Sequence, residues 1–92
     1  MTYESVAIKL QLTPEELERK SLRLFLIHRL RSLETQMLEF SRKYGVKTVV
    51  ELDELVQSGK LHESETYEDY FEMDHLEAER DITLELLKNT ER

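Results

Sequence analysis

Hydrophobic residues repeat at helical spacing along one long stretch, residues 13–44, which contains no Gly and no Pro after Pro14. Six of these positions are separated alternately by four and three residues: Leu26, Leu30, Leu33, Met37, Phe40 and Tyr44. Such a/d spacing is typical of a helix that lies along another helix. We therefore predict a long helix over residues 13–44, and we expect the first five positions of this seam to contribute to a partner interface.

Both ends of this stretch carry helix-boundary signals. Thr13, Pro14 and Glu16 match a capping box with Pro at the first helical position, and Gly45 suits the left-handed end of a helix. Thirty-two residues at 1.5 Å each span about 48 Å, whereas a compact chain of this size is roughly 32 Å across. The excess length predicts that part of the seam meets a second copy, in a homodimer.

Two further helices follow the long one. Thr48 and Glu51 form a second capping-box pattern, which predicts a short helix within residues 48–58. Thr66 is the expected cap of a third helix over residues 66–88, which should run antiparallel to the first. The predicted fold class is all-α, with residues 1–92 forming a single helical domain.

Residues 1–12 show a different pattern. Val6, Ile8, Leu10 and Leu12 alternate with other residues, and a period of two favours a half-buried strand. A single strand leaves its backbone groups unpaired, so we expect it to pair with the same strand of a second subunit. An extended arm on a helix, or a helical extension, is the alternative interpretation.

Composition narrows the function. The chain has no Cys, 36% charged residues and no long apolar run, which favours a cytoplasmic protein without a membrane span. High charge with few thermolabile side chains hints at a thermophilic source. The sequence contains neither a Gly-rich phosphate loop nor a recognisable nucleophile motif, so we predict a non-enzymatic protein without a cofactor.

The net charge of −7 is concentrated in the second half of the chain. Residues 46–92 contain fourteen Asp/Glu and five Lys/Arg, whereas residues 1–45 contain six and eight. An acidic chain is poorly suited to nucleic acid, because binding there depends on neutralising phosphates. Either the acidic half complements the basic helix within the fold, or it binds a basic protein partner.

One short pattern suggests a metal. Glu72 and His75 form Glu-x-x-His, which places a carboxylate and an imidazole one helical turn apart, and Glu34 or Glu39 could supply a third ligand. The pattern resembles encapsulated ferritins, short two-helix chains that assemble metal sites between subunits. This resemblance implies an alternative function as a metal-binding helical oligomer.

The same acidic segment is rich in aromatic residues. Tyr67, Tyr70 and Phe71 lie among acidic residues, which suits an interface with a basic partner, although Tyr70 and Phe71 are equally suited to the core of a helical hairpin. The order of a long capped helix, a short acidic helix and an acidic-aromatic helix resembles small prokaryotic antitoxin-type proteins over residues 20–88. This resemblance implies that the chain embraces a basic protein, the toxin.

Overall fold

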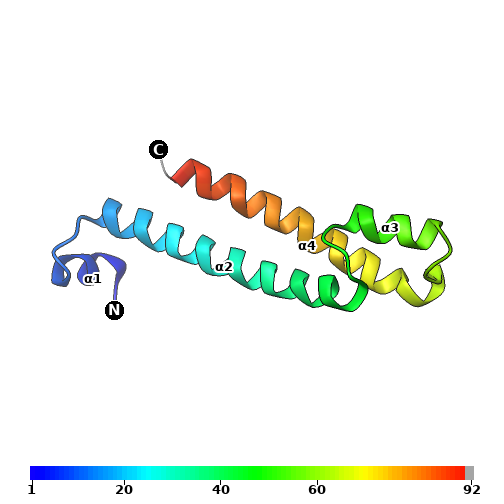
Figure 1. Cartoon of the computed structure of the whole chain (residues 1–92). Coiled ribbons are helices and arrows are strands. Elements are labelled where there is room, and N and C mark those ends of the chain that lie inside the picture. Colours follow the sequence, from blue (N-terminus) through cyan, green and yellow to red (C-terminus); the bar gives the residue numbers. More distant parts are fainter. Residues whose placement is uncertain (91–92) are drawn as a thin grey trace.

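The computed structural model describes residues 1–90 and shows an all-α protein, as predicted. Its helices are α1 (Tyr3–Lys9), α2 (Pro14–Tyr44), α3 (Val49–Gln57) and α4 (Glu63–Thr90). α2 and α4 form a long hairpin, α3 packs against α4 at the closed end, and α1 lies beside the start of α2 (Figure 1). The Tyr3 hydroxyl donates to the Pro14 carbonyl and fastens α1 to α2.

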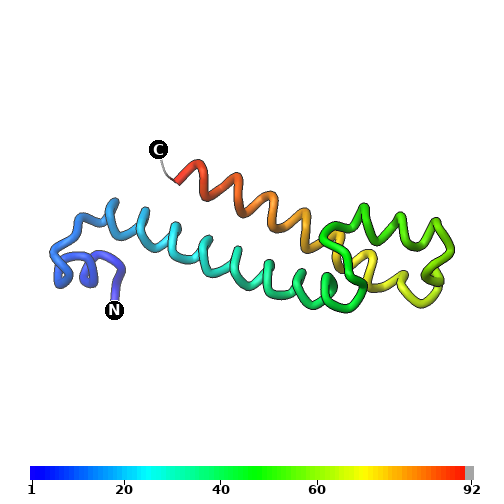
Figure 2. The backbone as a smooth tube through the Cα atoms, viewed as in Figure 1, coloured from blue at the N-terminus to red at the C-terminus, as the bar shows by residue number. Residues whose placement is uncertain are grey.

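The molecule is elongated. Its extents are 60 × 26 × 16 Å and its radius of gyration is 18.9 Å, compared with about 12 Å for a compact chain of this length (Figure 2). α4 has 28 residues and therefore covers most of the 31-residue α2. The assumption of a compact globule was wrong, and the length of α2 by itself does not require a second copy.

The boundaries of α2 agree with the capping signals. The Thr13 hydroxyl accepts a hydrogen bond from the Glu16 N–H at 3.0 Å, while the Glu16 carboxylate accepts from the Thr13 hydroxyl at 3.2 Å. Gly45 closes the helix with φ of 69°, a left-handed conformation, and its N–H donates to the Ser41 carbonyl. A residue without a Cβ adopts this conformation at little cost.

The backbone N–H groups at the start of α3 find acceptors both in the residues next to them and in a side chain of α4. The Thr48 hydroxyl accepts from the Glu51 N–H at 3.2 Å, and the Glu51 carboxylate accepts from the Lys47 N–H at 2.8 Å. The Val49 N–H donates to the carboxylate of Glu77 on α4 at 3.0 Å. The first turn of α3 is thus completed partly by a side chain of the helix on which it packs.

The core follows the line between α2 and α4 and thickens where α3 joins. One cluster of buried side chains contains Leu33, Met37 and Leu76, and a second contains Val46, Leu52 and Met73. Phe40 packs against both clusters. Full burial of one such side chain contributes about 1.5–3 kcal/mol, so the second cluster holds α3 in place.

The predicted N-terminal strand is a helix, and residues 1–90 contain no strand. Thr2 and Ser5 form a reciprocal capping box, with the Ser5 N–H donating to the Thr2 hydroxyl at 3.1 Å. Ala7 is the buried residue of α1, whereas Ile8 and Leu10 are exposed. The strand prediction was wrong because the alternation covers only two helical turns, and the local capping hydrogen bonds favour a helix there.

The third predicted helix begins earlier than expected. α4 starts at Glu63, and the predicted cap Thr66 lies inside it, where its buried hydroxyl donates to the His62 carbonyl at 3.0 Å. Glu63 and Glu65 occupy the first turn, where negative side chains favour the positive end of the helix dipole. Thr66 therefore bonds back to its own helix and does not cap it.

Candidate interaction surface

The seam of α2 faces α4 of the same chain. Leu26, Leu33 and Met37 are buried, and Leu30 and Phe40 are half-buried. These five positions, which the sequence suggested for a partner interface, therefore form the packing surface of the intrachain hairpin. A homodimer of this hairpin would need a different surface.

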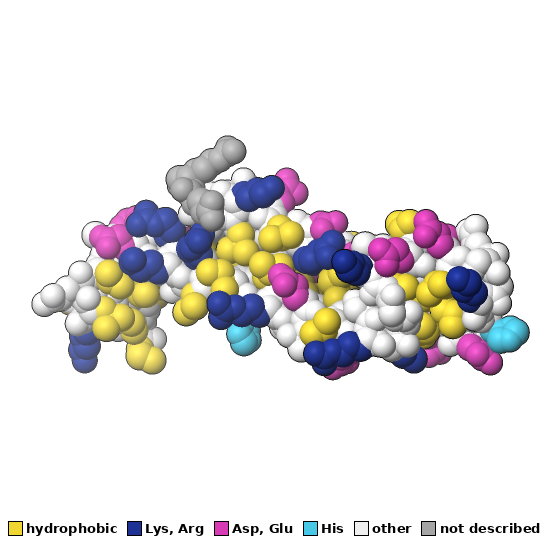
Figure 3. Space-filling model, in the orientation of Figure 1, with side chains coloured by type: hydrophobic (Ala, Val, Ile, Leu, Met, Phe, Trp, Pro, Cys, Tyr) yellow, Lys and Arg dark blue, Asp and Glu magenta, His cyan; other side chains and the backbone are white. Residues whose placement is uncertain are grey.

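Apolar side chains also remain exposed beside this seam. Leu38 of α2 and Leu84 of α4 line a shallow groove on the face that carries α3, next to the start of α3. Figure 3 shows hydrophobic side chains along the line between the two long helices on this face, with charged side chains on both sides. The hairpin thus buries one line of contacts and leaves its flanks uncovered.

Three aromatic rings gather at the closed end. The ring centroids of Tyr67 and Phe71 are 4.8 Å apart, and those of Tyr70 and Phe71 are 5.5 Å apart, both in edge-to-face geometry. Tyr70 also packs against the core cluster of Val46, Leu52 and Met73. The two interpretations of these aromatics are therefore combined, because Tyr70 supports the core while Tyr67 and Phe71 are more than half exposed.

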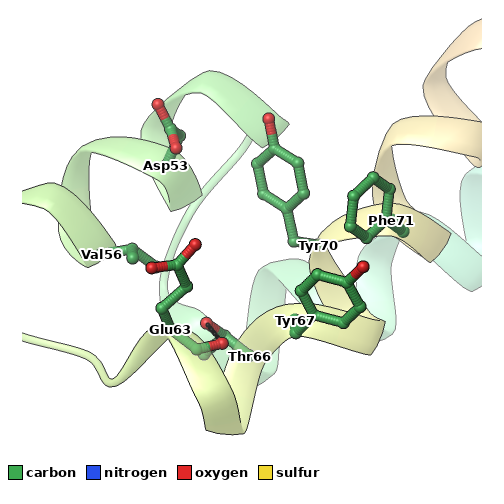
Figure 4. A pocket seen from close by; sticks show the side chains of 7 residues that line it. All are labelled: Asp53, Val56, Glu63, Thr66, Tyr67, Tyr70 and Phe71. Atoms are coloured by element: carbon green, nitrogen blue, oxygen red, sulfur yellow. Dashed lines mark hydrogen bonds between the residues drawn. The ribbon is translucent and has the colours of Figure 1, made fainter.

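A small cavity lies between α3 and α4 beside these rings. Its volume is about 230 Å³, and Figure 4 shows the side chains around it: Asp53, Val56, Glu63, Thr66, Tyr67, Tyr70 and Phe71. Carboxylates of Asp53 and Glu63 lie on one side and the tyrosine rings on the other. The amide of Gln57 donates to Asp53 at 2.9 Å and holds that carboxylate. No Lys or Arg lines the cavity.

Asp69 belongs to the hairpin and is not available to a partner. Its carboxylate accepts from the Lys43 ammonium at 2.6 Å and from the Tyr44 hydroxyl at 2.5 Å, both on α2. The hydrogen bond from Lys43, together with that from Tyr44, lowers the pKa of Asp69 below its ordinary 3.8. The hydrogen bond to Asp69 raises the pKa of Lys43, so the pair remains ionised over a wide pH range.

The Glu72 and His75 pair is exposed, and the structure gives it no third ligand. Residues 1–90 contain no group of three or more His, Asp or Glu side chains that could hold a metal ion. The His75 Nε2 atom lies 4.0 Å from the Glu79 carboxylate, which the Arg29 guanidinium contacts at 2.5 Å. A metal site assembled between two chains stays a prediction.

The basic part of α2 contacts α4 through Arg29, whose bridge to Glu79 joins the two helices. Much of the remaining positive charge on this half of α2 is solvent-exposed, on Arg19, Lys20 and Arg31. Charge complementarity within the fold is therefore real but partial, and the acidic end keeps a large excess of negative charge.

None of the helices in the described part of the chain combines the length and the apolar character that a membrane span requires. The fold and the surface together define a small helical-hairpin protein with an acidic, aromatic closed end. The chain belongs to the uncharacterized protein MJ0235 family, whose model matches residues 1–92. No curated protein and no solved structure gives a significant match. These comparisons show no link to antitoxins, so that resemblance stays a prediction.

Sequence reasoning identified the aromatic residues but missed the cavity beside them. Asp53 and Val56 are three residues apart and hence share one side of α3, a spacing that is visible in the sequence. The position of Glu63 inside α4 was hidden because the helix was expected to start at Thr66. With the earlier start, Glu63, Thr66 and Tyr70 fall on one side of α4, which is the side that α3 covers.

Proposed function

We propose that this protein is a non-enzymatic helical interaction protein that binds a basic protein partner through its acidic closed end. The cavity between α3 and α4 carries the proposal, because it combines two carboxylates with three aromatic rings. In its specific form the proposal is an antitoxin-like role, in which the basic partner is the toxin. The cavity would receive one Lys or Arg side chain of that partner.

The chemistry of the cavity favours a cation. Carboxylates of Asp53 and Glu63 offer negative charge, and the faces of Tyr67 and Tyr70 attract an ammonium or guanidinium group. The volume of about 230 Å³ lies below the roughly 300–1,000 Å³ of pockets for drug-sized ligands. A single long side chain is the ligand that matches both its size and its charge.

The surroundings of the cavity extend its negative potential. Residues 49–79, which span α3 and the first half of α4, contain eleven Asp/Glu and one Lys. A surface with so strong a charge of one sign speeds the approach of a partner of the opposite sign and disfavours acidic competitors. The exposed Tyr67 and Phe71 add apolar area beside the two carboxylates of the cavity.

Native mass spectrometry of the protein purified from its natural source tests the proposal. We expect the added mass of a second polypeptide in which Lys and Arg exceed Asp and Glu. The double variant Asp53→Asn/Glu63→Gln should lose that polypeptide, because the cavity would no longer offer charge to a Lys or Arg side chain.

The matched control changes the same charge at the same end but outside the cavity. Glu68→Gln/Glu72→Gln should retain the second polypeptide, with at most a salt-dependent weakening. A natural preparation that contains only this chain would refute the proposal. Equal binding by the cavity variant and the control would also refute the assignment of the cavity.

A further inference from the structure

α4 carries a second row of positions on the side that faces away from α2. The steps along it are four, four, three, four and four residues, so its members lie along one side of the helix. All are solvent-exposed, and the four large apolar members are 45–57% accessible. We call this row the outer stripe; it consists of Tyr67, Phe71, His75, Ala78, Ile82 and Leu86.

α2 extends the outer stripe at one end. The bridge between Arg29 and Glu79 marks the side of the hairpin on which both helices border the stripe. Seven residues before Arg29 is Leu22, and seven residues after Glu79 is Leu86, so both apolar residues lie on that same side. Leu22 is 51% exposed, which makes the apolar surface wider than one helix there.

We propose that the outer stripe is the contact surface between two copies of this chain, arranged antiparallel about a two-fold axis near residues 76 and 77. The order of residues along the stripe carries the proposal. Tyr67 pairs with Leu86 of the second copy, Phe71 with Ile82, and His75 with Ala78, and each pair is centred on the same point. A two-fold interface requires this self-complementarity, because each patch must fit itself.

The pairs also match in size. Each aromatic residue at one end of the stripe meets an aliphatic residue from the other end, a combination that fills space without two large rings colliding. Near the axis, Ala78 is small and lets the two helices approach, since the distance between helix axes depends on the side chains at the contact. His75 lies opposite Ala78 and retains access to its neighbour Glu79 at 4.0 Å.

Charge selects the antiparallel arrangement. Residues 63–76 of α4 contain six Asp/Glu and no Lys or Arg, whereas residues 77–90 contain four and two. A parallel pair would place two strongly acidic halves side by side. The antiparallel pair places each acidic half beside residues 77–90 of the second copy, where the excess of Asp and Glu is smaller.

The dimer is independent of the basic partner proposed above. Tyr67 and Phe71 lie at the border of the two surfaces, but Asp53 and Glu63 belong to the cavity alone, and Ile82 and Ala78 belong to the stripe alone. Variants of these residues therefore affect one interaction at a time. Failure of the dimer would leave the cavity proposal untouched, and the reverse also holds.

The first test is native mass spectrometry of the full chain at tens of micromolar, in a low-salt volatile buffer. We expect twice the chain mass of 11.0 kDa. Ile82→Glu should shift the protein to the monomer mass, because the two-fold axis brings two such charges into the contact. Leu38→Glu is the matched control on the groove face of α2, and it should remain a dimer.

Three results would overturn the proposal in this test. These are a monomeric wild type, a dimeric Ile82→Glu protein, and dissociation by Leu38→Glu with Ile82→Glu still paired. Far-ultraviolet circular dichroism accompanies each variant to show that its helices are retained. A variant that unfolds is judged by the second test, which leaves the stripe largely intact.

The second test uses disulfide formation. Because the chain contains no Cys, only the introduced cysteines can form a disulfide. Tyr67→Cys and Leu86→Cys proteins are mixed and briefly oxidised. The antiparallel dimer should give the mixed disulfide, while neither variant alone should be linked, because nineteen residues of helix separate like positions by about 28 Å. A disulfide within the Tyr67→Cys protein alone, or no mixed product, would overturn the arrangement.

Discussion

The two halves of the hairpin differ in how much apolar surface a further helix covers. At the closed end α3 lies on α4, and Leu52, Met73 and Val46 are buried together. At the open end the short α1 lies beside the start of α2, and Leu24, Phe25 and Leu86 remain exposed. Both halves of the hairpin are rich in apolar residues, but the nine-residue α3 buries more of them than the seven-residue α1 does.

This difference illustrates what two helices can achieve alone. Each helix of a hairpin buries one stripe against its neighbour, and any wider apolar surface needs another layer. The chain supplies that layer at the closed end with nine residues of α3. At the open end it supplies only the seven residues of α1 among the described helices, and the second copy that we propose would cover Leu86 there.

The largest expected effect comes from removing the side chain that α3 contributes to the core. Leu52→Ala should lower the free energy of unfolding by about 2–5 kcal/mol, because it leaves a cavity at a fully buried site. Leu24→Ala, at a position 69% exposed in the open half, should change it by less than about 0.5 kcal/mol. Urea unfolding measures both, and equal losses would contradict the contrast between the two halves.

A smaller effect is expected where α2 turns toward α3. Gly45→Ala should cost about 1–2 kcal/mol, because φ of 69° is strained for a residue with a Cβ, although no other atom would crowd that Cβ. Gln11 has φ of 61° at the other end of α2, so Gln11→Gly should relieve strain.

Thermal unfolding of both variants sharpens the comparison of the two ends. We expect Gly45→Ala to melt at a lower temperature than the wild type. In Gln11→Gly the melting temperature should not fall, and the amides of α1 should exchange more slowly with solvent. An unchanged melting temperature for Gly45→Ala would show that the closed end tolerates a different turn.

The smallest effect is a pH dependence of the closed end. The pKa of Asp69 is lowered in the folded protein, so its contribution to stability is fully present above 3.8 and is lost as the pH falls through the lower, folded value. Unfolding measured between neutral pH and pH 2 should show this loss in the wild type. Asp69→Asn should be less stable at neutral pH and should lack this part of the acid sensitivity.

Much of the fold was predictable because short-range hydrogen bonds determine where its helices begin and end. Thr13 and Gly45 delimit α2, and Thr48 opens α3, since each of these residues satisfies backbone groups within a few positions of itself. The predictions for α1 and for the start of α4 failed where two local signals competed. The strand prediction followed the alternation of residues 6–12 and overlooked the cap at Thr2, and Thr66 looked like a cap although Glu63 already begins the helix.

The candidate site was less predictable because it depends on which helix covers which side of another. Tyr67, Tyr70 and Phe71 were recognised from the sequence, but their division between core and surface depends on where α3 lies. The same holds for the seam of α2, which was expected to meet a second copy and in fact meets α4. Periodicity identifies an apolar side of a helix, whereas the identity of its neighbour is a property of the whole chain.

The hydrogen bond from Val49 to Glu77 has a consequence for the order of folding. During synthesis α3 leaves the ribosome ahead of Glu77, so its first turn lacks this acceptor until the middle of α4 has emerged and docked. Nine residues of helix are too short to persist alone in water. The element in the middle of the chain is therefore among the last to become stable, and its amides should exchange sooner than those of the two helices that hold it.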